Sequence, residues 1–166
     1  MRQENEALLG ENEHKLKSVK IGLDELAVNL KKSGMEKNKK KYFSRLIIRL
    51  EKLIDELIGF NFYTRDYINN IRSFEESGSH LKKINYSCNL IQTEISALKF
   101  EQELKEGAGI RNAIITNEGI YAEVYRIKHL RNAGEQEPLL QKQKFDELFR
   151  RIELLVLMLN RRITTE

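Results

Sequence analysis

The chain has 166 residues, enough for one domain with a hydrophobic core, and 40% of them are hydrophobic while 33% are charged. Its formal net charge of +4 allows polyanionic partners without requiring them. A single cysteine excludes an internal disulfide framework, and no stretch reaches the roughly 20 apolar residues of a membrane-spanning helix. The first residues also lack an apolar run of signal-peptide length, so we expect a soluble, cytoplasmic protein without membrane contact.

The first part of the chain predicts two helices. Between residues 14 and 32, apolar residues recur at helical spacing until Ser33 and Gly34 end the helix. This stripe consists of Leu16, Val19, Leu23, Leu26, Ala27 and Leu30. A second helix covers about 38–58, with a bent continuation to about 75 left open; its stripe consists of Phe43, Leu46, Ile47, Leu50, Leu53, Ile54, Leu57 and Ile58. We expect residues 1–13 to be disordered or frayed.

Three further helices are predicted in the second part. Residues 80–105 form one helix that Gly107 and Gly109 break, and helices over about 110–133 and 138–163 follow. The stripe of the first consists of Leu81, Ile84, Cys88, Ile91, Ile95 and Leu98. No segment alternates like a strand, and short connections favour antiparallel neighbours. Residues 14–166 are therefore predicted to be a single all-α domain, an antiparallel bundle of four to five helices, with Cys88 in its core.

The last predicted helix is apolar on more than one face. Besides its main stripe, it carries Leu154, Leu157 and Met158 on other sides. Such a helix is either central in its bundle or covered by a second chain. We expect a homo-oligomer with these three residues at the interface; a central helix in a monomer is the alternative.

No residue pattern predicts a metal site, a cofactor or a nucleophile. The three histidines lie far apart, and the chain has neither a Glu-x-x-His pair nor a His/Cys cluster with zinc spacing. A phosphate-binding loop and a dinucleotide fingerprint are also missing. We therefore expect no metal and no cofactor.

The basic segment at residues 31–52 is the main candidate for binding a partner. Four of its side chains, Lys41, Arg45, Arg49 and Lys52, fall within about 80° of one another on a helix, opposite the apolar stripe. Such a strip can follow the phosphate backbone of RNA or DNA, although it is also what a solvated helix face looks like. The nucleic-acid-binding candidates are Lys37, Lys39, Lys40, Lys41, Arg45, Arg49, Lys52, Lys128 and Arg131.

The stretch RIKHLRNAGEQEP at residues 126–138 has two interpretations. On a helical wheel, Arg131 lies on the apolar side of its helix, whereas Arg111, in a similar Arg-Asn pair, lies on the polar side. As a helix end, Gly134 takes the left-handed conformation, Arg131 bonds free carbonyls of the last turn, and Pro138 begins the next helix.

The second interpretation comes from the segment LRNAGEQEP, which resembles the motif of HEPN domains. These are helical bundles, many of them ribonucleases, with an Arg, often an Asn after it, and a His four to six residues further on. The resemblance implies a catalytic role for Arg131 and Asn132, with Lys128 lining the site. Gln136 stands where the His would be, and an amide does not exchange a proton near neutral pH.

The segment AEVYRIKHLRNAGEQEPLLQKQKFDELFRRIELLVLMLNRRI resembles a second family. Its members are small basic four-helix-bundle proteins, some encoded in ribosomal-RNA intervening sequences and others accessory partners of diversity-generating reverse transcriptases. Glu123, Tyr125 and the Leu- and Met-rich final helix carry this resemblance. It implies ring-like oligomers that bind nucleic acid or protein without catalysis.

Together these features predict a non-enzymatic, basic helical bundle that binds a protein partner or nucleic acid as a homo-oligomer. The alternative is a divergent HEPN-type ribonuclease or its inactive relative.

Overall fold

The computed structural model describes residues 2–165, so the expectations for Met1 and Glu166 lie outside the described residues. The described chain is all α-helical, as predicted, with one short 3₁₀ turn and no strand among these residues. The helices are α1 (Arg2–Lys32), α2 (Lys37–Ile68), α3 (Ser77–Leu98), α4 (Glu101–Ile115), α5 (Ile120–Asn132) and α6 (Lys142–Thr164), and the 3₁₀ turn η1 is Phe74–Glu76.

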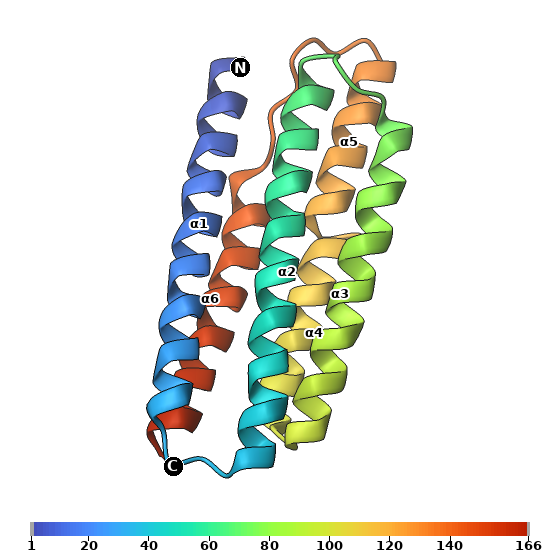
Figure 1. Ribbon diagram of the computed structural model, residues 1–166. Coiled ribbons are helices and arrows are strands. Elements are labelled where there is room, and N and C mark those ends of the chain that lie inside the picture. Colours follow the sequence, from blue (N-terminus) through green and yellow to red (C-terminus); the bar gives the residue numbers. More distant parts are fainter. Residues whose placement is uncertain (1, 166) are drawn as a thin grey trace.

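The helices form a closed bundle in which neighbours along the chain alternate in direction, except that α5 continues α4, while α1 and α6, which close the ring, run parallel (Figure 1). Helix α5 continues α4 along the bundle axis, so six helices fill five positions. Going round the bundle, α1 packs on α2, α2 on α3, α3 on α4, and α6 closes the ring between α4 and α1. The predicted bundle of four to five helices is confirmed, and α6 is one of the ring's members.

Helix α1 begins at Arg2, before the start at residue 14 that the sequence pattern indicated. The pattern missed the first turns because polar residues occupy two of the core positions there. Buried residues repeat at alternating spacings of four and three along the whole helix, at positions 5, 9, 12, 16, 19, 23, 26 and 30. Positions 5 and 12 are asparagines, which interrupt the apolar stripe. Asn5 is satisfied in the core: its Nδ2 donates to the Pro138 carbonyl (3.0 Å) and its Oδ1 accepts from the Leu140 amide (2.9 Å). Residues 2–13 therefore form the first turns of α1.

The breaks after α3 differ from those predicted at Gly107 and Gly109. The chain turns at Lys99, which has φ 60°, and α4 then runs through both glycines. A Cβ on Gly107 would meet the end of the Gln92 side chain, and one on Gly109 the end of the Arg151 side chain, so these two side chains pass over the glycines. The next break comes at residues 116–119, within the predicted helix 110–133.

The segment before α6 also differs from the prediction. Pro138 lies in the connection that follows α5, and α6 begins only at Lys142. Pro138 therefore is not in the first turn of the last helix. Its carbonyl instead accepts the hydrogen bond from Asn5 that fixes this connection against α1. Upstream, α2 runs unbroken to Ile68, so the continuation left open by the sequence is helical as far as Ile68, and residues 69–73 lie outside the helix.

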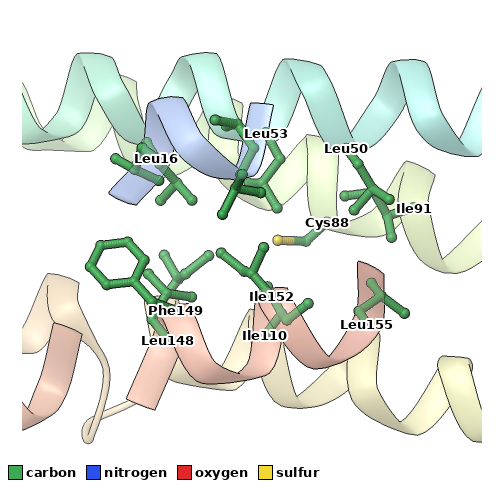
Figure 2. Close-up of a cluster of buried hydrophobic side chains, with 14 of the residues drawn as sticks. Leu16, Leu50, Leu53, Cys88, Ile91, Ile110, Leu148, Phe149, Ile152 and Leu155 are labelled. Carbon is green, nitrogen blue, oxygen red and sulfur yellow. The ribbon is translucent and has the colours of Figure 1, made fainter. Parts of the chain in front are cut away.

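The core lies along the axis between the five positions (Figure 2). Side chains from α1, α2, α3, α4 and α6 meet there, among them Leu16, Leu53, Cys88, Ile110 and Leu155. Each fully buried aliphatic side chain contributes roughly 1.5–3 kcal/mol, so this shared core holds the helix ends in register. Cys88 is buried as expected, and burial raises the pKa of its thiol to about 12.

Candidate functional site

Four segments of the chain end or begin at one end of the bundle (Figure 1). They are the last turn of α1, the first turns of α2, the turn between α3 and α4, and the last turn of α6. Each segment contributes Lys or Arg, although the turn between α3 and α4 contributes only Lys99. The fold therefore brings together basic residues that lie up to 130 positions apart in the sequence, as the separation of Lys31 from Arg161 shows.

Phe100 holds this end together. It is buried, and its ring meets that of Phe43 of α2 edge-on, with centroids 5.9 Å apart. Two cations lie over the same ring: Lys39 Nζ is 5.4 Å and the Arg162 guanidinium 4.5 Å from its centroid. Contacts of this kind stabilise by roughly 0.5–2 kcal/mol each. One aromatic side chain thus connects α2, the α3–α4 turn and α6.

We call this surface the basic end and define it by nine residues: Lys31, Lys32, Lys37, Lys39, Lys40, Lys41, Arg45, Lys99 and Arg161. Seven are exposed, and Lys39 and Lys40 are half-buried. Within the described part of the chain, no carboxylate pairs with the exposed lysines of this set, and Lys40 donates to the Lys31 carbonyl (3.3 Å). Their charges are therefore available to a partner.

Two of the nearby carboxylates are already occupied. Glu36 caps α2 by accepting from the backbone amides of Asn38 (3.0 Å) and Lys39 (3.2 Å). Glu103 is buried and pairs with Arg162 at 2.6 Å. The third, Glu101, is exposed. Among the described residues, the basic end consequently keeps an excess of positive charge.

The rest of the predicted strip along α2 is less accessible or less basic. Arg49 is half-buried, and its Nε has no hydrogen-bond partner in the described structure. Lys52 is exposed but lines a groove between α2 and α3 together with Glu51, Asp55 and Glu56. Acidic neighbours reduce the attraction of Lys52 for a phosphate. The free basic surface on α2 therefore ends near Arg45.

Arg131 lies at the opposite end and has a structural role. Its Nη1 donates to the Tyr67 carbonyl (2.8 Å) and its Nη2 to the Ile68 carbonyl, while its guanidinium lies 5.0 Å from the centroid of the Tyr67 ring. These carbonyls belong to the last turn of α2, whose final carbonyls have no partner four residues further on within the helix, and the Tyr67 carbonyl also accepts from the Asn70 amide (3.0 Å). The predicted orientation toward the core is explained, but Arg131 caps a neighbouring helix instead of its own.

The carbonyls at the end of α5 accept hydrogen bonds from backbone amides, so they do not need the Arg131 side chain. Gly134 has φ 91°, its amide bonds the Arg131 carbonyl, and the Glu135 amide bonds the Leu130 carbonyl, both at 3.0 Å. This is the Schellman pattern of helix ends. The predicted left-handed conformation of Gly134 is confirmed.

The other residues of this stretch lie beside Arg131. Lys128 Nζ is 3.3 Å from a Glu75 oxygen and 4.8 Å from the Phe74 ring centroid. Asn132 and Gln136 are exposed, and Gln136 lines a pocket of about 510 Å³ together with Arg131. Lys40 and Tyr67 are separated by 27 residues of α2, or about 40 Å. Of the nine predicted nucleic-acid-binding residues, five thus lie at the basic end, Lys128 and Arg131 lie at the opposite end, and Arg49 and Lys52 lie between them along α2.

The end that contains Arg131 is acidic. We call it the acidic end and define it by Glu4, Glu6, Asp66, Glu75, Glu76, Glu135 and Glu137. Among the described side chains, three of its cations are engaged by carboxylates: Arg65 pairs with Glu6, Arg72 with Asp66 and Glu76, and Lys128 with Glu75. The fold separates charge along the bundle axis, which the net charge of +4 does not reveal.

The predicted oligomer residues lie on α6. Leu157 is 48% exposed, whereas Leu154 and Met158 are half-buried. Only one of the three therefore presents a largely uncovered apolar side chain.

Sequence reasoning missed Lys99 and Arg161, and it did not join Lys31 and Lys32 to the binding set. The sequence did indicate that these four residues could lie together, because each of them stands at the end of an apolar helical stripe. Helices of similar length that alternate in direction bring such ends together. Their neighbours on the surface, however, depend on the order of helices in space.

The chain matches no protein-family model, no curated protein and no solved structure. In the described part of the chain, no helix is long and apolar enough to cross a bilayer, and no three His, Cys, Asp or Glu side chains gather as a metal site would require.

Proposed function

We propose that the protein is a non-enzymatic module that binds the phosphate backbone of a nucleic acid through the basic end. The observation that carries this proposal is the convergence of nine Lys and Arg residues from four segments on one surface, with exposed lysines that no carboxylate neutralises in the described chain. Exposed Lys and Arg side chains bind phosphates by replacing condensed counterions.

The surface favours a duplex backbone over stacked single-stranded bases. Tyr42 is an exposed aromatic residue beside the basic end, and the Arg45 guanidinium lies 5.7 Å from its ring centroid. Proteins that hold single strands usually provide several aromatic rings for base stacking. The buried Phe100 is unavailable for this purpose.

A charge-matched pair of variants tests the proposal. The site variant replaces Lys37, Lys40, Lys41 and Arg45 with Gln, and the control replaces Lys17, Lys52, Lys82 and Lys83 with Gln. Both lower the net charge from +4 to 0, since four positive charges are removed from each. Binding to labelled RNA and DNA duplexes is measured at two salt concentrations.

If about five phosphates are contacted, the logarithm of the affinity falls by roughly 4–5 per logarithm of salt concentration, and each lost contact removes about 0.9 from that slope. We expect a weakening of about tenfold or more and a shallower slope for the site variant only. Equal effects of the two variants, or no salt-sensitive binding by the wild type, would contradict the proposal.

The ribonuclease alternative has one observation in its favour, which is that Arg131 and Gln136 line one pocket. Against it, both terminal nitrogens of Arg131 are used by the carbonyls of α2. Incubation of mixed RNA with the wild type and with Arg131→Ala separates the two functions. Cleavage by the wild type that the variant lacks would support a nuclease; we expect neither protein to cleave.

We also propose a homo-oligomer through α6, supported by the exposed Leu157. Light scattering of the wild type and of Leu157→Lys measures it. A monomeric wild type would remove this part of the proposal without affecting the basic end.

A further inference from the structure

Helix α1 carries a line of exposed residues opposite the stripe that it buries. Ala7, His14, Ile21 and Val28 recur at every seventh position, and all four are exposed. Seven residues make almost two full helical turns, so these side chains share one face, about 180° from the buried stripe. We call this face the outer line of α1. Helices α2 and α6 pack on the other sides of α1, so the outer line faces away from the bundle (Figure 1).

The outer line is apolar in its second half. Ile21 is 60% exposed and Val28 is 49% exposed, which makes them the most exposed large apolar side chains in the described part of α1. Both are β-branched and therefore stiff, so little side-chain freedom is lost when they are covered. A helix with apolar side chains on a second face is suited to pack against another chain.

A hollow beside the outer line has the form of a helix-packing site. It measures about 320 Å³ and is lined by Gly10, Glu13, His14 and Lys17. These positions follow the spacing i, i+3, i+4 and i+7, and four neighbouring residues of a helix form the hole that receives one side chain of a facing helix. A Cβ on Gly10 would meet nothing within 4 Å, so the space above it is open to an incoming side chain.

Charged residues flank the outer line at similar angles on its two sides. Lys17 and Asp24 lie about 50° to one side, toward α2. Glu11 and Lys32 lie about 50° to the other side, toward α6. All four are exposed. On one flank the base comes before the acid in the sequence, and on the other flank the acid comes first.

This order of charges is self-complementary when two α1 helices pair in opposite directions. A two-fold axis at Ile21 brings each position opposite the one equally far beyond Ile21, and it keeps each flank against the same flank of the second copy. Lys17 then lies beside Asp24 of the second copy, and Glu11 lies beside Lys32 of the second copy. By symmetry each of these two contacts occurs twice.

The apolar residues fit the same arrangement. Position 28 is seven residues after Ile21 and position 14 is seven residues before it, so Val28 enters the hollow beside His14 of the second copy. A parallel pair would instead bring Asp24 against Glu25 of the second copy, and like charges that face each other oppose association. The sequence of α1 therefore favours the antiparallel pair.

The flank toward α2 carries negative charge that the described chain leaves unpaired. Burial and the neighbouring Asp24 carboxyl raise the pKa of Glu51, and the nearby Lys20 pairs with Asp55 at 2.7 Å. In the part of the chain that the structure describes, neither Asp24 nor Glu51 has an ion-pair partner. Lys17 of the second copy supplies a cation here, since its own pair lies within one helix at the surface, where such pairs contribute little.

We propose that two copies of the chain associate through their α1 helices, in opposite directions, with Ile21 at the two-fold axis. The paired segments, residues 11–32, extend about 33 Å along each helix. The inference does not rest on nucleic-acid binding, although Lys32 also belongs to the basic end. It uses a different helix from Leu157 of α6.

Sedimentation equilibrium of the wild type, of Ile21→Glu and of the control Ile48→Glu tests the interface. Ile48 is 59% exposed and lies in the groove between α2 and α3, so the control introduces the same charge at an equally exposed isoleucine. Ile21→Glu sets two carboxylates against each other at the axis. We expect it to weaken dimerisation about tenfold or more, against less than about twofold for the control. A wild type that stays monomeric at about 1 mM, or equal weakening by both variants, overturns the proposal.

A charge exchange tests the direction of the two helices. Lys17→Glu alone places like charges beside Asp24 of the second copy, and we expect dimerisation to weaken about fivefold or more. Adding Asp24→Lys restores the pair with opposite polarity and should bring the affinity back to within about twofold of the wild type. If the second substitution restores nothing, the antiparallel arrangement is wrong.

Cysteine crosslinking tests the position of the axis. Cys88 is buried, so an introduced exposed cysteine is the reactive one. Ile21→Cys should give a crosslinked dimer on mild oxidation, whereas Val28→Cys should not, because position 28 faces position 14 of the second copy. The reverse result overturns the proposal. A dimer that Leu157→Lys dissociates and Ile21→Glu does not would also overturn it, while leaving the oligomer through α6 in place.

Discussion

The two ends of the bundle use the same residue types in opposite ways. At the basic end, exposed lysines face solvent with no carboxylate partner in the described chain. At the acidic end, Arg65, Arg72, Lys128 and Arg131 are all bound by carboxylates or carbonyls. A positive charge in the sequence is therefore a candidate for binding only where the fold leaves it unpaired.

This comparison predicts that cations bound by carboxylates or carbonyls contribute to the stability of the fold, whereas exposed cations without a carboxylate partner contribute to binding. Arg162 is the strongest test because it is an engaged cation close to the basic end. Arg162→Ala would leave the buried Glu103 carboxylate without its partner, and we expect a loss of about 3 kcal/mol in the free energy of unfolding. Urea denaturation measures it. Adding Glu103→Gln to this variant should restore part of the loss; no restoration would show that the charge of Glu103 is not its cause.

Arg131→Ala is expected to have the next largest effect. It removes two hydrogen bonds and leaves the Tyr67 and Ile68 carbonyls at the end of α2 without these partners, at a cost of about 2 kcal/mol. Arg131→Lys should recover only part of this, since an ammonium group does not reproduce the guanidinium fork. Duplex binding should stay within twofold of the wild type. A stable Arg131→Ala variant that lost duplex binding would reverse the roles assigned to the two ends.

The buried Tyr63 of α2 predicts a pH dependence of stability. The Tyr63 hydroxyl donates to the carbonyls of Ser73 (2.9 Å) and Phe74 (3.1 Å), and burial raises its pKa from 10.0 to about 12. The unfolded chain loses this proton near pH 10 while the folded chain keeps it, so stability falls as pH rises from 10 to 12. Denaturation at several pH values compares the wild type with Tyr63→Phe, whose curve should be flatter over this range.

The smallest expected effect concerns the free cations themselves. Lys31→Gln, Lys37→Gln and Lys41→Gln should each change the free energy of unfolding by no more than about 0.5 kcal/mol, as is usual for surface residues. Thermal denaturation measures the change. A larger loss in any of them would show that the basic end also has a structural role.

The periodicity of apolar residues predicted the features of the fold that depend on local sequence. The apolar stripes identified the helices, the all-α class, the burial of Cys88 and the left-handed Gly134, because helix formation and helix ends depend on nearby residues. The same method missed the first turns of α1, where Asn5 and Asn12 occupy core positions, and placed the break at Gly107 and Gly109. Asn5 is explained only by its distant partners Pro138 and Leu140, and Gly107 and Gly109 lie against the Gln92 and Arg151 side chains of neighbouring helices. Asn12 is buried with no hydrogen-bond partner among the described residues, and nothing in the structure explains it.

Arg131 illustrates the difference between what the local sequence determines and what only the tertiary structure decides. By itself the sequence determined that this side chain points toward the core side of its helix, since the angle per residue is fixed. Only the tertiary structure decided that α2 ends beside it, so that the guanidinium caps Tyr67 and Ile68. In the same way, the sequence determined that lysines stand at helix ends, and the order of helices decided that four such segments form one basic surface. Charges act through space, and their neighbours in space are set by packing between helices.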